Sequence, residues 1–347
     1  MTALAAALVS AGVLGAGVVL AGPVRAATAT ADALDRSMGG DAPAYHALEE
    51  GRVGDATTLL RGTLAADQGD GLAHQLLCRV FYAEEEADEA IRECELAVSN
   101  AKSNSEQAKN NNEQASDDEL WLGRAYGMKA RHAGPIAGFT LARKVQASFA
   151  RAVELNPGSV AALNDLGEYD VAAPFVVGGG TDKARELAAR MMPRFPEAAH
   201  HLLARIAASD GDLATAESEY RQEIAVQRSA EAWIDLAHFY QKYSRPDDAL
   251  ATIKIAIAAD RSHGPAEVDA ASILTAAHRD PALAERCLRD YLASRAKTDA
   301  APAFKVHLQL GRLLAARGDS NGASREAEAA AELAPGFTQR GRPAQGL

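Results

Sequence analysis

Apolar residues recur with helical spacing through most of this chain, and short turns interrupt them at regular distances. The stretch SFARAVELNPGSVAALNDLGEY, residues 148–169, shows one such junction, where one apolar face ends at Pro157 and another begins. Proline ends a helix because it lacks an amide hydrogen and excludes the preceding residue from the helical region. The pattern therefore predicts pairs of helices joined by tight turns.

A small residue follows each of several short acidic turns, at intervals of mostly 32 to 39 residues. These markers are Ala56, Ala90, Ala184, Ala216, Ala249, Ala284 and Ala323. Small side chains let two helices approach closely, and this interval is typical of a helix-turn-helix solenoid. No pair buries its apolar face alone, so stability is expected to come from contacts between neighbouring pairs.

The composition favours the same class, because the chain is 48% apolar but only 5% aromatic over 347 residues. A core so rich in alanine needs closely approaching elements, which helices provide better than large sheets. The formal net charge of -11 argues against nucleic acid as a partner, since phosphate-backbone binders carry a basic patch.

One stretch carries a family resemblance. Trp233, Leu236, Ala237, Tyr240, Ala249, Ile253 and Ala256 occupy places 4, 7, 8, 11, 20, 24 and 27 of a 34-residue unit. This stretch resembles the tetratricopeptide repeat (TPR), and weaker matches extend along most of the chain. The resemblance implies an all-α, right-handed superhelical solenoid of about seven to eight TPR-like helix pairs, acting as a non-catalytic scaffold for a protein or peptide.

Three segments depart from the repeat. The Asn- and Ser-rich residues 102–118 are expected to be a polar spacer, with a frayed helix extension as the alternative. Residues 128–140 are expected to form an inserted loop whose Ile136 and Phe139 fold back over the edge of the array. Residues 172–183 are expected to form a second loop, in which three glycines permit positive φ, Thr181 or Asp182 caps the next helix, and Phe175 packs inward. The glycine spacing does not fit a phosphate-binding loop.

The motifs GRAYGMKA, FARAVELNP and APFVVGGGTDKA, within residues 119–215, resemble a bacterial exported TPR subgroup. They are also similar to the animal regulators of microtubule dynamics and to TPR proteins associated with tripartite (TRAP-type) transporters. The resemblance implies a second possible function, as an accessory component of a periplasmic solute-uptake system that holds a small ligand or docks a substrate-binding protein.

The N-terminus predicts export. An apolar run from Leu4 to Ala21 precedes Val24 and Ala26, which supply the small residues of a signal-peptidase site. Cleavage after Ala26 would give a periplasmic protein, whereas an uncleaved run would anchor it in a membrane. The predicted organisation is residues 1–26 as signal or anchor, 27–101 as degenerate repeats, 119–335 as the main array and 336–347 as a flexible tail.

Few residues suggest chemistry. Three cysteines are too few for a disulfide-built scaffold. Cys78 and Cys94 face each other across one helix pair, and a disulfide is one possibility; we favour two unbridged core residues, because buried helix interiors usually hold their Cα atoms too far apart. Adjacent His200 and His201 diverge by about 100° on a helix, so they do not face one metal ion together. With no metal, cofactor or catalytic motif, we expect no enzyme.

The candidate binding surface is the concave face formed by the first helix of each pair. Its predicted residues are Arg79, Arg124, Asn164, Glu168, His201, Arg205, His238 and Arg312. Place nine of the repeat is arginine in four of seven units, which predicts a basic stripe for an acidic peptide or a free C-terminus. The alternative is that these arginines pair with acids on the adjacent helix. The chaperone-type carboxylate clamp does not fit, because place five lacks the lysine that the resemblance implies.

Overall fold

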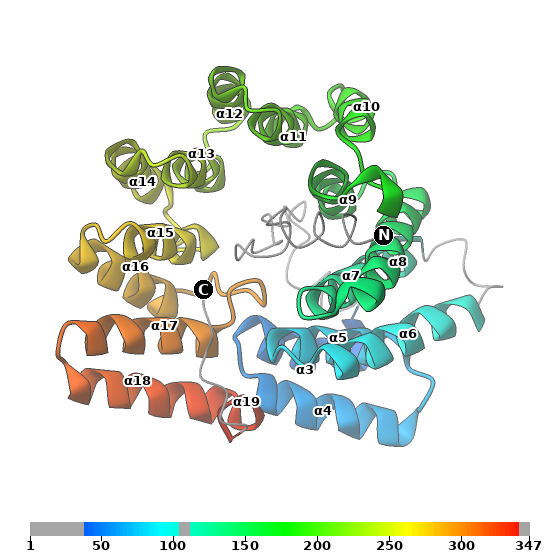
Figure 1. Cartoon of the computed structure of the whole chain (residues 1–347). Coiled ribbons are helices and arrows are strands. Elements are labelled where there is room, and N and C mark those ends of the chain that lie inside the picture. The colour runs from blue at the N-terminus through cyan, green and yellow to red at the C-terminus, as the bar shows by residue number, and fades with distance from the viewer. Residues whose placement is uncertain (1–37, 104–111, 340–347) are drawn as a thin grey trace. The chain divides into compact units, whose positions relative to one another are not determined.

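The computed structural model describes residues 38–103 and 112–339, and every regular element in these ranges is helical. The N-terminal half contains η1 (Gly39–Asp41), α3 (Ala42–Glu49), α4 (Val53–Ala66), α5 (Gly71–Ala83), α6 (Ala87–Ser103), α7 (Asn112–Ala130), α8 (Pro135–Leu155), α9 (Val160–Ala172), η3 (Phe175–Val177) and α10 (Thr181–Met191). The C-terminal half contains α11 (Pro196–Ser209), α12 (Leu213–Val226), α13 (Ala230–Lys242), α14 (Pro246–Ala259), α15 (Pro265–Ala276), α16 (Pro281–Ala293), α17 (Ala303–Ala316), α18 (Ser320–Leu333) and α19 (Pro335–Gln339). Figure 1 shows the helices following one another in pairs. The all-α prediction is confirmed, and α3 to α18 form eight successive pairs.

The chain divides into two compact units. Among the described residues, the first unit contains 38–45, 57–103 and 112–198, and the second contains 46–56 and 199–339. Each unit is considered separately below.

Turn chemistry sets where the helices begin. Asp70, Asp212 and Asp319 each accept a hydrogen bond from a backbone amide in the first turn of α5, α12 and α18. Such a cap satisfies a donor that has no partner within the helix. Gly211 and Gly318 precede two of these caps with φ of 83° and 85°, a conformation that suits glycine. The Gly-Asp dipeptide therefore ends one helix of a pair and starts the next.

The helix contacts follow the predicted small residues. Six of the seven marker alanines are at most 1% exposed, whereas Ala323 is half-buried. Gly123 of α7 shows how tight these contacts are, because an added Cβ would lie 2.5 Å from the ring of Phe149 in α8. A side chain at Gly123 would therefore push the two helices apart.

Within each unit the first helices of successive pairs form one layer, which we call the helix-A layer. In the first unit α7 contacts both α5 and α9, and in the second α13 contacts α15. The second helix of each pair packs between its own partner and the next first helix, as α6 does against α5 and α7 and α14 does against α13 and α15. This order gives each unit one face of first helices and another of second helices.

The polar spacer is shorter than predicted. α6 continues to Ser103 and α7 begins at Asn112, so the prediction is wrong for residues 112–118; residues 104–111 lie outside the described chain. Polar side chains hold the start of α7 in place, since buried Ser116 donates a hydrogen bond to the carbonyl of Ala152, 2.8 Å away. A polar sequence thus forms a helix because neighbouring residues form hydrogen bonds with its polar side chains.

The first inserted loop is also largely helical. Only residues 131–134 separate α7 from α8, and Pro135 occupies the first turn of α8, where its missing amide costs nothing. The insertion lengthens both helices. Ile136 is 88% exposed, so the expectation that it folds back over the array is wrong, whereas Phe139 is half-buried.

The second inserted loop is confirmed between α9 and α10, where only the short η3 is regular. Gly178 and Gly180 have φ of 99° and 140°, as expected. The capping prediction is wrong, because the cap position of α10 is Gly180, which has no side chain. Phe175 is 81% exposed and does not pack inward. Lys183 instead donates a hydrogen bond to the carbonyl of Gly178, at 2.5 Å.

A disulfide joins Cys78 of α5 to Cys94 of α6, with their Cα atoms 5.2 Å apart. The preference for unbridged cysteines is therefore wrong. The helices approach closely enough because alanines fill their contact, with Ala90 and Ala97 fully buried. Cys287 is buried and free.

No helix in the described ranges is long and apolar enough to cross a membrane. The predicted signal or anchor and residues 340–347 of the predicted tail lie outside these ranges. Residues 336–339 belong to α19, where Phe337 is buried, so the prediction of a flexible tail is wrong for them.

Candidate functional site

The helix-A layer carries all eight predicted site residues, but with very different exposure. Arg79 and Arg124 are buried, Asn164, Glu168, His201 and Arg205 are half-buried, and His238 and Arg312 are exposed. They divide between the two compact units, and the two arginines of the first unit are buried.

In the first unit the two arginines belong to the interior. Arg124 of α7 is 6% exposed and pairs with Asp165 of α9, at 2.7 Å from Nε to Oδ2 and 3.4 Å from Nη2 to Oδ1. Its guanidinium also lies 4.6 Å from the ring centroid of Trp121. Arg79 lies 5.2 Å from the same ring and 5.4 Å from that of Tyr45. The expectation of an exposed Arg124 is wrong, and the alternative of pairing with the adjacent helix is confirmed for this residue.

The positive charge of Arg124 and the negative charge of Asp165 stabilise each other in the interior. Burial raises the pKa of Asp165, while Arg124 opposes that rise. Removing either partner would leave an uncompensated charge in the interior. The pair therefore links two successive first helices and is not available to a ligand.

Three helix pairs contain a polar contact that the sequence analysis missed. His74 bonds to Glu93, His200 to Glu219 and His307 to Glu326, with Nδ1 to Oε2 distances of 2.7, 2.7 and 2.6 Å. Each separation along the chain is 19 residues, from repeat place four to place 23. The recurring His-to-Glu interval was visible in the sequence. It assigns His200 to a contact within its pair, whereas His201 points elsewhere.

In the second unit, acidic side chains gather near His201 and Asp269. His201 of α11 meets Asp235 of α13 and Glu223 of α12, and Asp269 lies on α15. Burial and the carboxylates of Asp235 and Glu231 raise the pKa of Asp269 to about 7. This charge does not favour an acidic peptide, so the basic surface must be sought on another face.

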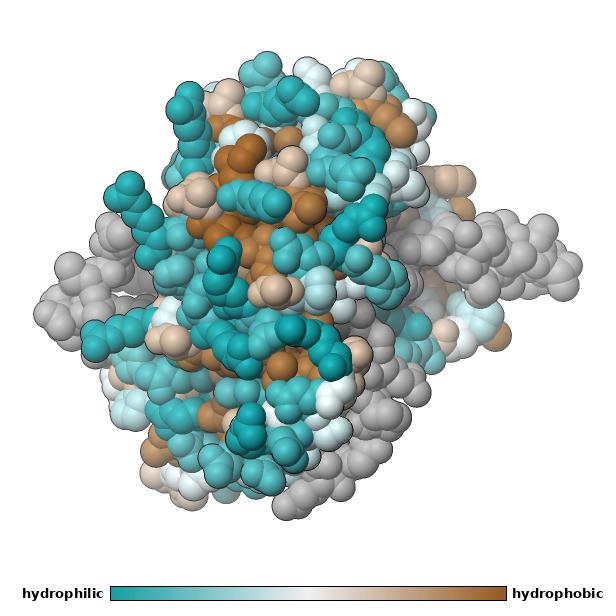
Figure 2. All heavy atoms as spheres, turned by 90° about the vertical axis from the view of Figure 1, so that its left-hand side faces the viewer, coloured by the Kyte–Doolittle hydropathy of each residue, from teal (hydrophilic) through white to brown (hydrophobic). Residues whose placement is uncertain are grey.

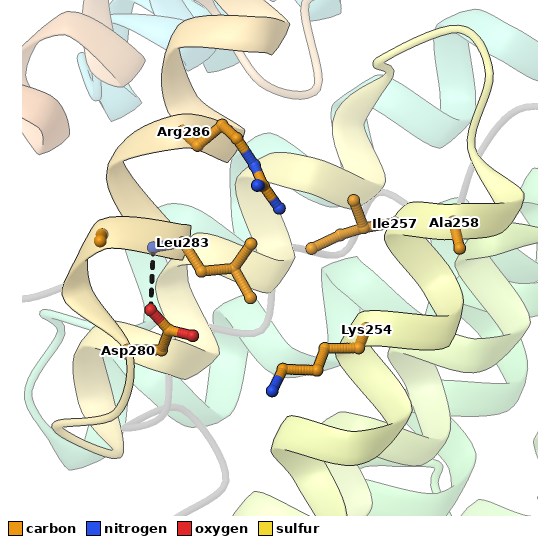
Figure 3. Close-up of a pocket in the computed structure, with 7 residues that line it drawn as sticks. Lys254, Ile257, Ala258, Asp280, Leu283 and Arg286 are labelled. Atoms are coloured by element: carbon orange, nitrogen blue, oxygen red, sulfur yellow. Dashed lines mark hydrogen bonds between the residues drawn. The ribbon is translucent and has the colours of Figure 1, made fainter.

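A groove of about 550 Å³ lies between the second helices α14 and α16. Its floor contains Ile257 and Leu283, and Lys254 and Arg286 stand on either side, as Figure 3 shows. Asp280 lies at one end, where its Oδ1 accepts a hydrogen bond from the amide of Leu283 at 3.1 Å and caps α16. We call this the α14–α16 groove.

The two cations of this groove are available. Lys254 and Arg286 are exposed, and neither forms an ion pair or hydrogen bond within the described part of the chain. The neighbouring Glu285 already bonds to Arg289 and Arg317. Figure 2 views the molecule from the side where α14 and α16 lie, and shows apolar side chains gathered among hydrophilic ones. Ile255 of α14 is also 46% exposed.

The groove lies on second helices, whereas the predicted binding residues all lie on first helices. Lys254 and Arg286 occupy places 25 and 22 of their repeats, where a cation ordinarily reads as a solvated surface residue. The groove depends on the separation of α14 from α16, which a single sequence does not specify.

No family model matches the chain, and no curated protein matches it. Among solved structures, the crystal structure of yeast Tom70 is similar with a TM-score of 0.44 and 14% identity, covering 78% of this chain and 60% of Tom70. A monomeric mutant of IFIT1 with m7Gppp-AAAA is similar with a TM-score of 0.37 and 14% identity, covering 79% of this chain and 64% of IFIT1. The chain thus spans less than two thirds of either protein. The description of its architecture is based on its own helix pairs and not on these similarities.

Proposed function

We propose that this protein is an exported, non-catalytic, TPR-like scaffold that binds a partner protein through an acidic, partly apolar peptide segment in the α14–α16 groove. The observation that carries the proposal is the pair of available cations, Lys254 and Arg286, on either side of an apolar floor. Carboxylates of a peptide would meet the cations while an aliphatic or aromatic side chain covered Ile257 and Leu283.

Charge contrast supports this choice of ligand. The whole chain carries a formal charge of -11, whereas Lys254 and Arg286 give the groove two positive charges. Acidic segments would be repelled by most of the protein and attracted to this groove, which favours one docking position over others. The buried arginines of the first unit offer no comparable attraction, because Asp165 already neutralises Arg124.

The experiment uses fluorescent peptides in which Asp or Glu alternates with Leu or Phe, and matching peptides with Lys in place of the acids. We expect the acidic set to bind the wild-type protein, and Lys254→Glu with Arg286→Glu to weaken that binding at least about tenfold, as the loss of two ionic contacts would. Arg228→Glu with Arg261→Glu is the matched control, since both residues are exposed in the same unit and the charge change is equal.

Equal loss in the two double variants would show that only net charge matters and would contradict a specific groove. Binding of the Lys peptides as tightly as the acidic set would contradict the proposed ligand class. The solute-uptake alternative stays a hypothesis that no feature of the described residues favours.

Export is supported by the Cys78–Cys94 disulfide, because such bonds persist mainly in oxidising compartments. The test is the N-terminal sequence of the protein recovered from the exported fraction. We expect it to begin at Ala27, and an intact residue 1 on a membrane-bound protein would favour the anchor.

A further inference from the structure

Two first helices and one second helix bring metal-binding side chains together in the second unit. His201 comes from α11, Glu223 from α12 and Asp235 from α13, and one ligand atom from each lies within 4.8 Å of the other two. His201 Nδ1 is 3.5 Å from Glu223 Oε1 and 3.3 Å from Asp235 Oδ2. We propose that these three side chains form a binding site for a divalent transition metal of the zinc class.

The distances fit a metal better than direct hydrogen bonds. Nitrogen and oxygen ligands bound at roughly 2.0–2.2 Å in a tetrahedral arrangement lie about 3.4 Å from one another. The two measured separations fall on either side of that value. By contrast, the His200–Glu219 contact on the preceding residue is 2.7 Å, an ordinary hydrogen bond.

Glu223 supplies a second, independent observation. It is 3% exposed, and its Oε2 atom is buried without a hydrogen-bond partner among the described residues. A buried carboxylate oxygen normally has a partner, because desolvation without one is costly. A cation between Glu223, Asp235 and His201 would satisfy it and balance the two carboxylates.

The donor set indicates the class of metal. One imidazole and two carboxylates are intermediate ligands that suit zinc and its first-row neighbours, whereas calcium and magnesium prefer all-oxygen sites. Three protein ligands leave a coordination position for water or for a group of a bound partner. Half-buried Arg205 and exposed His238 are the nearby basic groups, and they limit the affinity without supplying a ligand to the cluster.

The sequence of α11 alone does not reveal this site. His200 and His201 point about 100° apart on the helix, so they cannot both serve as ligands of one metal ion. The acids come from the next two helices, 22 and 34 residues later, a separation that only the stacking of helix pairs brings together.

The test is a zinc titration of the untagged protein at neutral pH in competition with a chromophoric chelator. We expect one site in the wild type, and a loss of affinity of at least about 100-fold in Glu223→Gln and in His201→Gln, because even changes outside the coordination sphere can cost 10–100-fold. His200→Gln is the matched control and should keep the wild-type affinity. Circular dichroism establishes that each variant is folded.

Cobalt provides an independent readout, since its visible absorption reports the coordination geometry. We expect bands of a four- or five-coordinate ion that disappear in Asp235→Asn and persist in His200→Gln. The proposal is wrong if the wild type binds no zinc, or if zinc binding survives both Glu223→Gln and His201→Gln. Binding lost on His263→Gln but not on His201→Gln would assign the metal to the other cluster, formed by His263, Glu267 and Asp290, and would also overturn it.

Discussion

The two compact units handle a carboxylate of a first helix in opposite ways at equivalent repeat positions. Asp165 in the first unit and Asp235 in the second both occupy place six of a first helix, and both meet a basic residue of the preceding first helix. Asp165 meets the permanently charged Arg124, which also lies against Trp121. Asp235 contacts His201, whose imidazole can lose its proton. His201 also contacts Glu223.

The difference shows how one architecture gives a rigid contact in one place and a ligand site in another. A guanidinium remains charged at all ordinary pH values and closes the contact between α7 and α9. An imidazole is neutral at and above neutral pH and can then bind a metal. The first unit is also cross-linked by Cys78–Cys94, whereas no disulfide occurs among the described residues of the second. We therefore expect stabilising contacts in the first unit and ligand-dependent ones in the second.

The largest effect should come from breaking the ion pair between Arg124 and Asp165. We expect Arg124→Ala to lower the free energy of unfolding by about 3–5 kcal/mol, because it leaves Asp165 buried without its cation. Urea titration followed by circular dichroism measures the change. Arg312→Ala is the matched control at the same repeat place, and its exposed side chain should contribute less than about 0.5 kcal/mol.

A loss of under about 1 kcal/mol in Arg124→Ala would contradict the role of this pair. The double variant Arg124→Met with Asp165→Leu sharpens the test, because it removes both charges together. We expect it to be more stable than Arg124→Ala alone.

The next effect concerns the cross-link of the first unit. Removing it with Cys78→Ala and Cys94→Ala should cost about 2–4 kcal/mol, since the bond closes a loop with a separation of 16 residues. The measurement is the melting temperature with and without a reducing agent. Reductant should lower it in the wild type and leave it unchanged in the double variant; equal responses would show that the bond does not stabilise the fold.

Sequence predicted the helix pairs well because their determinants are local. The spacing of alanines, proline turns such as Pro157 and aspartate caps such as Asp212 act within one pair. The predictions failed where a residue depends on a neighbouring pair. Residues 112–118 look like a spacer by composition, yet Ser116 bonds to α8 and holds them in a helix.

The site predictions failed for the same physical reason. Place nine of the repeat located Arg124 correctly on the helix-A layer, but its exposure depends on Asp165, 41 residues away. The clustering of His201 with Glu223 and the separation of α14 from α16 likewise depend on how successive pairs stack. These distances follow from packing, which periodicity alone does not describe.

A smaller effect in the first unit depends on pH. Burial and the adjacent Asp117 and Glu119 raise the pKa of Asp118 to about 7, against a hydrogen bond from Gln114. Because the folded pKa exceeds the unfolded value near 4, the stability from the protonated carboxyl is present in acid and is lost as pH rises through about 7. We expect Asp118→Asn to be more stable than the wild type at pH 8 by roughly 2 kcal/mol, and not at pH 4. Equal pH dependence in both proteins would contradict this.

The smallest effect on stability should come from replacing Glu223, which shares His201 with Asp235. Burial and Asp235 raise the pKa of Glu223, so without a metal its carboxyl favours the protonated form. Glu223→Gln then replaces one neutral group by another and should change the free energy of unfolding by less than about 1 kcal/mol. Asp165→Asn should cost more, because it leaves Arg124 buried without an anion.

Zinc should separate the two amide variants further. A ligand that binds only the folded state at 100 times its dissociation constant adds about 2.7 kcal/mol of stability. We expect zinc to stabilise the wild type and Asp165→Asn by this amount, and Glu223→Gln by none of it, when urea titrations are compared with and without zinc. Equal stabilisation of all three proteins would mean that zinc binds elsewhere. Glu223 and Asp235 would then share a proton, whereas Asp165 pairs with the cation of Arg124.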